Sequence, residues 1–147
     1  ILMKKKFNLL LIIFILINQI SHANTNQIFF TQSKEKFENN EIEDSKFLFQ
    51  RDIVFNPKNA KSYLYLAKIY NYEKDEKKEI KNLNTTLLLD PNNEEAIYLM
   101  INIEIKKSNF NEVKKLMKNF SLICKNFCDK IDSIEENLKN IEPKNET

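Results

Sequence analysis

Residues 56–70 read NPKNAKSYLYLAKIY, and residues 90–104 read DPNNEEAIYLMINIE. The two stretches start 34 positions apart, and in each a polar residue and a proline precede polar residues and then a mainly apolar run. A period of roughly 20 to 50 residues is typical of proteins that stack one structural unit repeatedly. The similarity of these two stretches therefore predicts a repeat protein. Stacked helical repeats usually bind other proteins rather than catalyse reactions.

The unit that ends at the second proline, residues 58–91, is predicted to be a helical hairpin. Four apolar residues at i, i+3, i+4 and i+7 give its first helix one apolar face: Tyr63, Leu66, Ala67 and Tyr70. Residues 71–78 are polar and predict the turn. A second series follows and stops at Asp90-Pro91, because proline cannot continue a helix. Its members are Ile80, Leu83 and Leu87.

The same period locates a hairpin on either side. Upstream, residues 24–57 contain two helical series separated by Asn39-Asn40, and Asn is the best substitute for Gly in a left-handed turn. Downstream, residues 92–125 contain two series separated by Ser108-Asn109. The apolar positions are Phe29, Phe30, Phe37, Ile42, Phe49, Ile53 and Phe55 upstream, and Ile97, Met100, Ile101, Ile105, Phe110, Val113, Leu116, Met117 and Phe120 downstream.

At these positions the chain resembles the tetratricopeptide repeat (TPR) family, whose unit is a helix–turn–helix. The resemblance covers residues 24–125 as three degenerate repeats, and it implies an all-α, right-handed superhelical stack of three hairpins. A generic helical bundle is the alternative. The matching residues are Tyr63, Leu66, Ala67, Tyr70, Leu83, Leu87, Asp90 and Pro91 in the middle repeat, Ser33, Asn40, Ile42, Ser45, Asn56 and Pro57 in the first, and Ile97, Ser108, Phe110 and Val113 in the third.

Four residues depart from the family's pattern. Ile101 and Glu79 stand where small residues are expected, and a glutamate there puts close helix packing in the middle repeat in doubt. Glu104 replaces the expected tyrosine of the third repeat, and Lys125 replaces its closing proline.

Residues 1–23 have the composition of a secretory signal peptide. Three lysines at 4–6 precede the apolar run 7–17, and Ser21-His22-Ala23 supplies the small residues that signal peptidase prefers. We therefore expect cleavage after Ala23 and a periplasmic or secreted protein. An uncleaved segment that anchors the protein in the inner membrane is the alternative.

Residues 126–147 are predicted to form a capping helix and a tail. The apolar residues recur at spacings of three and four, which gives one narrow face, and Asn126 is a candidate N-cap. Repeat arrays need an end unit with a polar outer surface. A seam for self-association is the alternative. The apolar positions are Phe127, Ile131, Ile134, Leu138 and Ile141.

Cys124 and Cys128 flank the junction between the third repeat and the capping helix. In an exported protein a structural disulfide is expected. Two buried thiols, or a redox-active thiol whose pKa is lowered in the first turn of a helix, are the alternatives. Three residues separate the pair, which is not a zinc-type spacing, and the only histidine, His22, lies in the signal segment. No metal and no cofactor are expected.

Composition excludes several further classes. The chain has 147 residues, with 23 basic against 21 acidic side chains, so it lacks the charge of a nucleic-acid-binding protein. It contains no glycine, which removes glycine-rich phosphate loops. With no mature histidine, no nucleophile–base pair emerges, and an enzyme is not expected.

The resemblance further implies that the first helices line a concave groove that binds another protein or peptide. Lys34, Lys68 and Asn102 occupy equivalent places beside apolar residues, which suits a peptide with acidic and apolar side chains. Ordinary solvated helix faces are the alternative. The family's carboxylate clamp is not expected, because Phe30 and Leu64 stand at clamp positions. The groove candidates are Gln27, Phe30, Lys34, Lys61, Leu64, Lys68, Glu95, Tyr98 and Asn102.

These observations together predict an exported, non-enzymatic adaptor or scaffold of the bacterial cell envelope. The alternatives are a membrane-anchored assembly subunit and a thiol-redox protein that uses Cys124 and Cys128.

Overall fold

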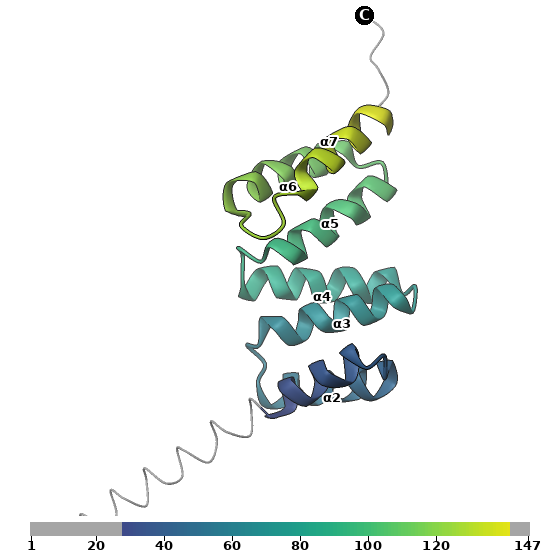
Figure 1. Cartoon of the computed structure of the whole chain (residues 1–147), viewed down its shortest axis with the longest axis vertical. Helices are drawn as coiled ribbons and strands as arrows, with labels where there is room; N and C mark the ends of the chain where they lie inside the picture. Colours follow the sequence, from purple (N-terminus) through teal and green to yellow (C-terminus); the bar gives the residue numbers. More distant parts are fainter. Residues whose placement is uncertain (1–27, 142–147) are drawn as a thin grey trace, which may run out of the picture. The chain divides into compact units, whose positions relative to one another are not determined.

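The computed structural model describes residues 28–141 (Figure 1). The predicted signal peptide, residues 1–23, and the groove candidate Gln27 lie outside these residues, as does the side chain of Ile141.

The described part of the chain is all-α, as predicted. Six of its seven helices pack in pairs as hairpins, and α7 follows the last pair. The first helix covers residues 28–38. The others are α2 (Ile42–Phe55), α3 (Ala60–Tyr72), α4 (Glu76–Leu89), α5 (Glu94–Lys106), α6 (Phe110–Ile123) and α7 (Lys130–Ile141). None of the helices in the described residues is long and apolar enough to cross a membrane.

The turn inside each hairpin has the same backbone structure. Asn40, Lys74 and Ser108 have φ angles of 62°, 61° and 56°, and they lie one period apart. The next backbone N–H donates to the carbonyl five residues earlier, at 2.9 Å in all three turns. This bond and the left-handed residue together form the Schellman motif, which ends a helix and is usually built on glycine. The chain has no glycine, so side-chain-bearing residues adopt the conformation.

The chain divides into two compact units that part between Tyr65 and Leu66. In the first unit, aromatic rings form the core: Phe49 is fully buried and stacks on Tyr65 with centroids 4.9 Å apart. Ser33 and Ser45 are buried between the two helices, and Ser45 Oγ donates to the Ser33 carbonyl at 2.9 Å. The small residues expected at these positions therefore allow the helices to approach closely.

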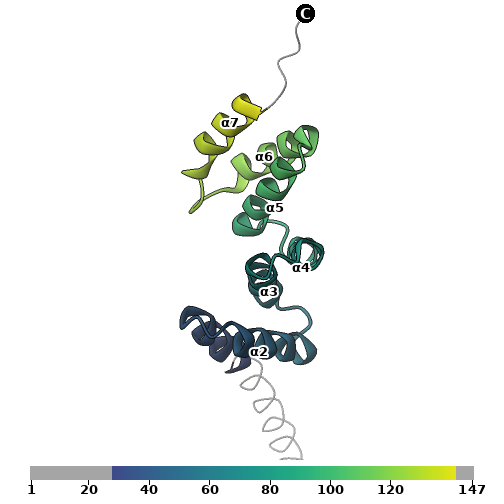
Figure 2. The same cartoon turned by 90° about the vertical axis from the view of Figure 1, so that its right-hand side faces the viewer.

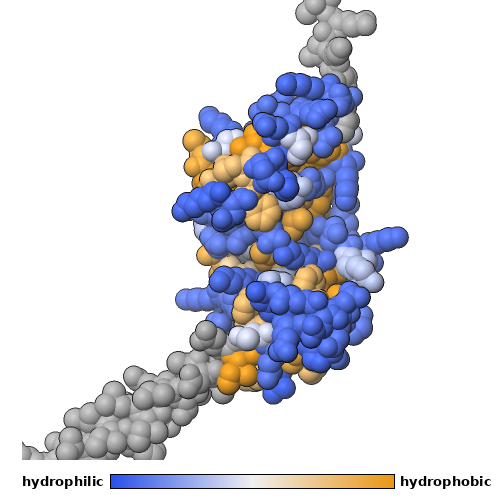
Figure 3. All heavy atoms as spheres, in the orientation of Figure 1, coloured by the Kyte–Doolittle hydropathy of each residue, from blue (hydrophilic) through white to orange (hydrophobic). Residues whose placement is uncertain are grey.

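The core of the second unit is mainly aliphatic. It unites α5, α6 and α7, which lie side by side (Figures 1 and 2). The buried members of this cluster are Ile97, Ile101, Val113, Met117, Phe120, Ile134 and Leu138. Two of these come from α7, so α7 covers the last hairpin. On the face seen in Figure 3, hydrophilic residues cover most of the described surface, with hydrophobic residues in smaller patches between them.

Glu79 occupies the position of Ser45 and Val113 in the neighbouring repeats and is buried as they are, at 4% exposed. Asn71 Nδ2 donates to its Oε1 at 2.9 Å, which satisfies one carboxylate oxygen. Burial raises the pKa of Glu79, although this hydrogen bond opposes the shift. The helices of the middle repeat thus pack closely around Glu79, although its carboxyl group loses hydration when it is buried.

The left-handed turns generate a prediction about stability. Lys74→Gly should raise the free energy of unfolding by about 0.5 to 1 kcal/mol, because glycine adopts a positive φ without the steric penalty of a Cβ. Lys77→Gly, a matched change inside α4, should lower it by about 1 kcal/mol. Urea unfolding followed by circular dichroism measures both. A loss of stability in Lys74→Gly would contradict the argument.

The burial of Glu79 generates a second prediction. A carboxyl group whose pKa is raised by folding contributes stability below its ordinary pKa, and that contribution is lost as the pH rises through the raised value. Glu79→Gln keeps the acceptor for Asn71 and removes the titration. It should therefore raise the melting temperature at pH 7, with a smaller gain at pH 4. The exposed Glu76 of the same helix turn is the control, and Glu76→Gln should bring no gain at pH 7.

Candidate peptide-binding face and the disulfide loop

In the second unit, the predicted groove residues meet on one face of α5. Glu95, Tyr98 and Asn102 follow one another at spacings of three and four, so they share a face, and all three are half-buried. Lys68 of α3 reaches this face, and its Nζ lies 2.5 Å from Glu95 Oε1. We call these four residues, Lys68, Glu95, Tyr98 and Asn102, the α5 face.

The ion pair between Lys68 and Glu95 changes the expected electrostatics. The side chains are 25% and 28% exposed, so the pair is partly shielded from water. Lys68 therefore does not present an unpaired cation. A ligand carboxylate that bound Lys68 would have to compete with Glu95.

In the first unit, the predicted groove residues do not all reach the surface. Lys61 is exposed, and Lys34 is exposed and pairs with Glu38 at 3.3 Å. Phe30 is half-buried and packs against Phe49, with centroids 5.9 Å apart.

Leu64 corrects the predicted groove, because only 6% of this residue is exposed. The reason is that α3 is buried on most of its circumference, so an apolar position outside the main stripe is covered too. The buried positions of α3 are Ser62, Leu64, Leu66, Ala67, Ile69 and Tyr70.

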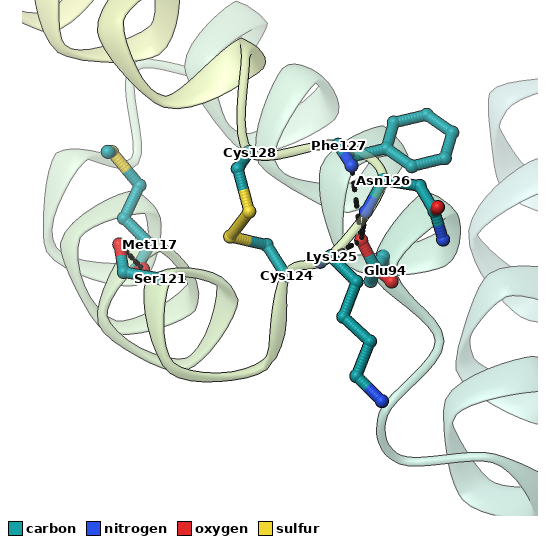
Figure 4. Close-up of a disulfide and its surroundings, with 8 residues drawn as sticks. All are labelled: Glu94, Met117, Ser121, Cys124, Lys125, Asn126, Phe127 and Cys128. Atoms are coloured by element: carbon teal, nitrogen blue, oxygen red, sulfur yellow. Dashed lines mark hydrogen bonds between the residues drawn. A yellow bond between two sulfur atoms is a disulfide. The ribbon is translucent and has the colours of Figure 1, made fainter.

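The segment between α6 and α7 differs from the predicted helix start. The capping helix was expected to begin near Asn126, but α7 begins at Lys130. Cys124 Sγ and Cys128 Sγ lie at disulfide-bonding distance, 2.14 Å, with the Cα atoms 5.3 Å apart. Residues 124–128 thus form a small closed loop, here called the disulfide loop (Figure 4). Cys128 lies in this loop and not in the first turn of a helix.

Glu94, the first residue of α5, holds the disulfide loop. Its Oε2 accepts the backbone N–H groups of Lys125, Asn126 and Phe127 at 2.7, 2.8 and 3.1 Å (Figure 4). These hydrogen bonds, with that from Lys125 the largest contribution, lower the pKa of Glu94. Asn126 does not cap α7, because that helix begins four residues later, at Lys130.

The disulfide loop also contacts the α5 face. The Phe127 ring lies 6.1 Å from the Tyr98 ring, which in turn stacks at 6.4 Å on the buried ring of Phe120. Residues 125–127 thus touch α5 at Glu94 and at Tyr98, one helical turn later. The loop covers one end of the face that was predicted to bind a peptide.

The role of Glu94 was not predicted from the sequence, although one signal existed. Lys125 stands where the earlier repeats have Pro57 and Pro91. Proline has no backbone N–H, so lysine at this position supplies a donor that the first two repeats lack. Among the described residues, no group of three or more His, Cys, Asp or Glu side chains could hold a metal ion.

Comparisons with solved structures show the class of fold. The chain is similar to the type III secretion chaperone SycD of Yersinia enterocolitica in complex with a peptide of the translocator YopD. The TM-score is 0.69, with 13% identity over 80% of this chain and 92% of that one. It is equally similar to the first TPR of Spaghetti (RPAP3) bound to an HSP90 peptide, with TM-score 0.69 and 11% identity over 80% of this chain and 96% of that one.

A second structure of SycD gives a TM-score of 0.66, with 15% identity over 86% of this chain and 96% of that one. No protein-family model matches the sequence, and no curated protein matches it. The likeness therefore shows a TPR-like helical repeat fold. Two of these neighbours are described with a bound peptide.

Proposed function

We propose that this protein is a non-enzymatic adaptor of the cell envelope that binds a peptide segment of another protein on its first helices. The observation that carries the proposal is the α5 face, which lies on the first helix of a hairpin in a fold whose solved neighbours include peptide complexes.

The side chains of the α5 face suit a ligand with acidic and apolar residues. A ligand carboxylate can replace Glu95 on Lys68, which forms a charge-assisted hydrogen bond. Tyr98 offers an aromatic ring, and Asn102 carries an amide that can both donate and accept hydrogen bonds with a peptide backbone. The Lys68–Glu95 pair gives selectivity, because a ligand without a carboxylate gains nothing by breaking it.

An adaptor fits the chain better than an enzyme does. His22 is the only histidine of the sequence and falls in the predicted signal segment. Without it, the general base of a nucleophile–base pair would have to be a carboxylate or a lysine. The one buried glutamate identified in the second unit, Glu79, is hydrogen-bonded by Asn71 and positions no nucleophile.

The proposed location in the cell envelope rests on the sequence of residues 1–23 and on the two cysteines. Export would bring Cys124 and Cys128 into an oxidising compartment, where a disulfide can form. A membrane-anchored assembly subunit is the alternative form of the same proposal, in which residues 1–23 remain attached.

Two opposite variants test the α5 face. Fluorescein-labelled twelve-residue peptides rich in Asp and Leu serve as probes, with Lys/Leu peptides as charge-reversed controls. Glu95→Gln removes the carboxylate that competes for Lys68 and should tighten binding of the acidic peptide about tenfold. Lys68→Gln should weaken it about tenfold, the effect of one charge-assisted hydrogen bond. Fluorescence anisotropy gives the dissociation constants.

The control for this experiment is Lys118→Gln, which removes an exposed lysine from α6 and should leave affinity unchanged. Equal dissociation constants for the wild type, Glu95→Gln and Lys68→Gln would exclude the α5 face as the site.

The location is tested by N-terminal sequencing of the protein purified from an envelope fraction of the native cell. The expected first residue is Asn24, because cleavage is predicted after Ala23. A chain that retains residues 1–23 in the membrane fraction would establish the anchored alternative. Recovery of the full-length chain from the cytosol would exclude both.

A further inference from the structure

The third repeat ends differently from the first two. We call the segment that follows the second helix of each repeat a joint. In the first two joints, a backbone N–H donates to the carbonyl of the C-cap residue of the preceding helix. The bonds run from Asn59 to Asn56 at 3.0 Å and from Asn93 to Asp90 at 3.1 Å. At the third joint, the equivalent N–H belongs to Phe127, and it donates to Glu94 instead. The Phe127 N–H of this link is thus bound by a side chain of α5 rather than by the carbonyl of the C-cap residue.

The three N–H groups that bind Glu94 come from consecutive residues. They reach one carboxylate oxygen together only in a restricted set of backbone conformations, and a flexible segment would have to lose entropy to adopt one. The Cys124–Cys128 bond closes the chain around these three residues. The disulfide therefore restricts the loop before it contacts Glu94, so less entropy is lost when the three hydrogen bonds form.

The disulfide loop in turn positions α7. Lys130 follows the loop within two residues, and its N–H donates to the Phe127 carbonyl at 3.0 Å. Further along α7, Ile134 and Leu138 are buried in the cluster with Ile97 and Ile101 of α5. α7 is short, at 12 residues, and helices of this length are marginal without tertiary contacts. Its order therefore depends both on these buried contacts and on the loop that holds its N-terminal end.

We propose that the Cys124–Cys128 disulfide is a redox switch that holds residues 125–127 on Glu94 and Tyr98 and, through them, holds α7 on the last hairpin. In the oxidised chain the loop covers the Tyr98 end of the α5 face. In the reduced chain the loop leaves Glu94, and both the α5 face and the apolar surface under α7 become accessible. The effect on peptide binding rests on the proposed function, whereas the effect on α7 does not.

The reduction needs a dithiol, the chemical class of small-molecule dithiols and of thioredoxin-like proteins. Cys128 is exposed and Cys124 is half-buried, so a thiolate of the dithiol attacks Cys128 Sγ. The bond between the two cysteines breaks, and Cys124 leaves as a thiolate that takes a proton from water. The second thiol of the reductant then forms a disulfide with the first and releases Cys128. Two electrons and two protons pass from the dithiol to this chain.

Hydrogen–deuterium exchange with mass spectrometry tests the switch on the full chain. Treatment with dithiothreitol should add 2 Da by complete reduction and lower the protection of α7 amides about 30-fold, the effect of freeing a loop of this size. Protection of α4 should not change. A fully reduced chain in which α7 keeps its protection would overturn the proposal.

Two variants separate the contributions of the bond and of Glu94. The double variant Cys124→Ser with Cys128→Ser should exchange like the reduced wild type and should not respond to dithiothreitol. Glu94→Gln should speed exchange of α7 in the oxidised chain, while the matched Glu95→Gln should not. Normal α7 protection in Glu94→Gln would overturn the role of Glu94. If the serine variant fails to fold, reduction of the wild type still decides the question.

The Asp/Leu peptide distinguishes failure of the switch from failure of the proposed function. Tighter peptide binding after reduction, together with loss of α7 protection, supports both. If reduction lowers the protection of α7 but leaves a measurable peptide affinity unchanged, the switch is supported. The same result would show that the Tyr98 end of the α5 face does not contribute to peptide binding. No binding in either redox state overturns the proposed peptide site and leaves the switch supported by the exchange data.

Discussion

A hairpin of two amphipathic helices cannot bury its own apolar face, and the structure depends on this constraint. Each hairpin needs a covering element, and the last one needs an element whose outer surface is polar. α7 meets this requirement, because Ile134 and Leu138 face the core of the second unit while most of its other described side chains are exposed. The disulfide loop lies between the last repeat and α7, where the repeat pattern of the sequence ends.

The joint to α7 shows how a local change in sequence alters the chemistry of a repeat. The replacement of proline by Lys125 adds a backbone donor, and Glu94 supplies the acceptor. A carboxylate that accepts three N–H groups is strongly favoured in its charged form, which agrees with the lowered pKa of Glu94. The third repeat thus replaces a rigid proline joint with a polar contact and a disulfide, and a disulfide can be reversed.

The position of Glu94 next to Glu95 connects this joint with the α5 face. Glu95 pairs with Lys68, and one residue earlier Glu94 binds the disulfide loop. The N-terminal turn of α5 therefore carries two carboxylates that are both engaged within the chain, Glu95 on the α5 face and Glu94 beside it. A ligand of the proposed kind has to compete with one of them, and the proposed switch would release the other.

The period of the sequence determined the all-α fold, the pairing of helices and the places of the turns. Asn40 and Ser108 lie in turns that were expected from their residue types, because turn chemistry is local. The buried serines Ser33 and Ser45 were also predictable, since a small residue at a fixed phase of the period lets two helices approach. The groove across the first helices and export from the cell stay predictions.

Tertiary structure alone decided the burial of Leu64, the late start of α7 and the role of Glu94. Periodicity shows which residues share a helix face, but it does not show how much of that face the packed elements cover. For this reason Leu64 was predicted to line the groove. Glu94 and Lys125 lie 31 positions apart in the chain. Their contact follows from the packing of α5, α6 and α7, and packing sums many weak contacts between residues distant in sequence, so no local pattern specifies it.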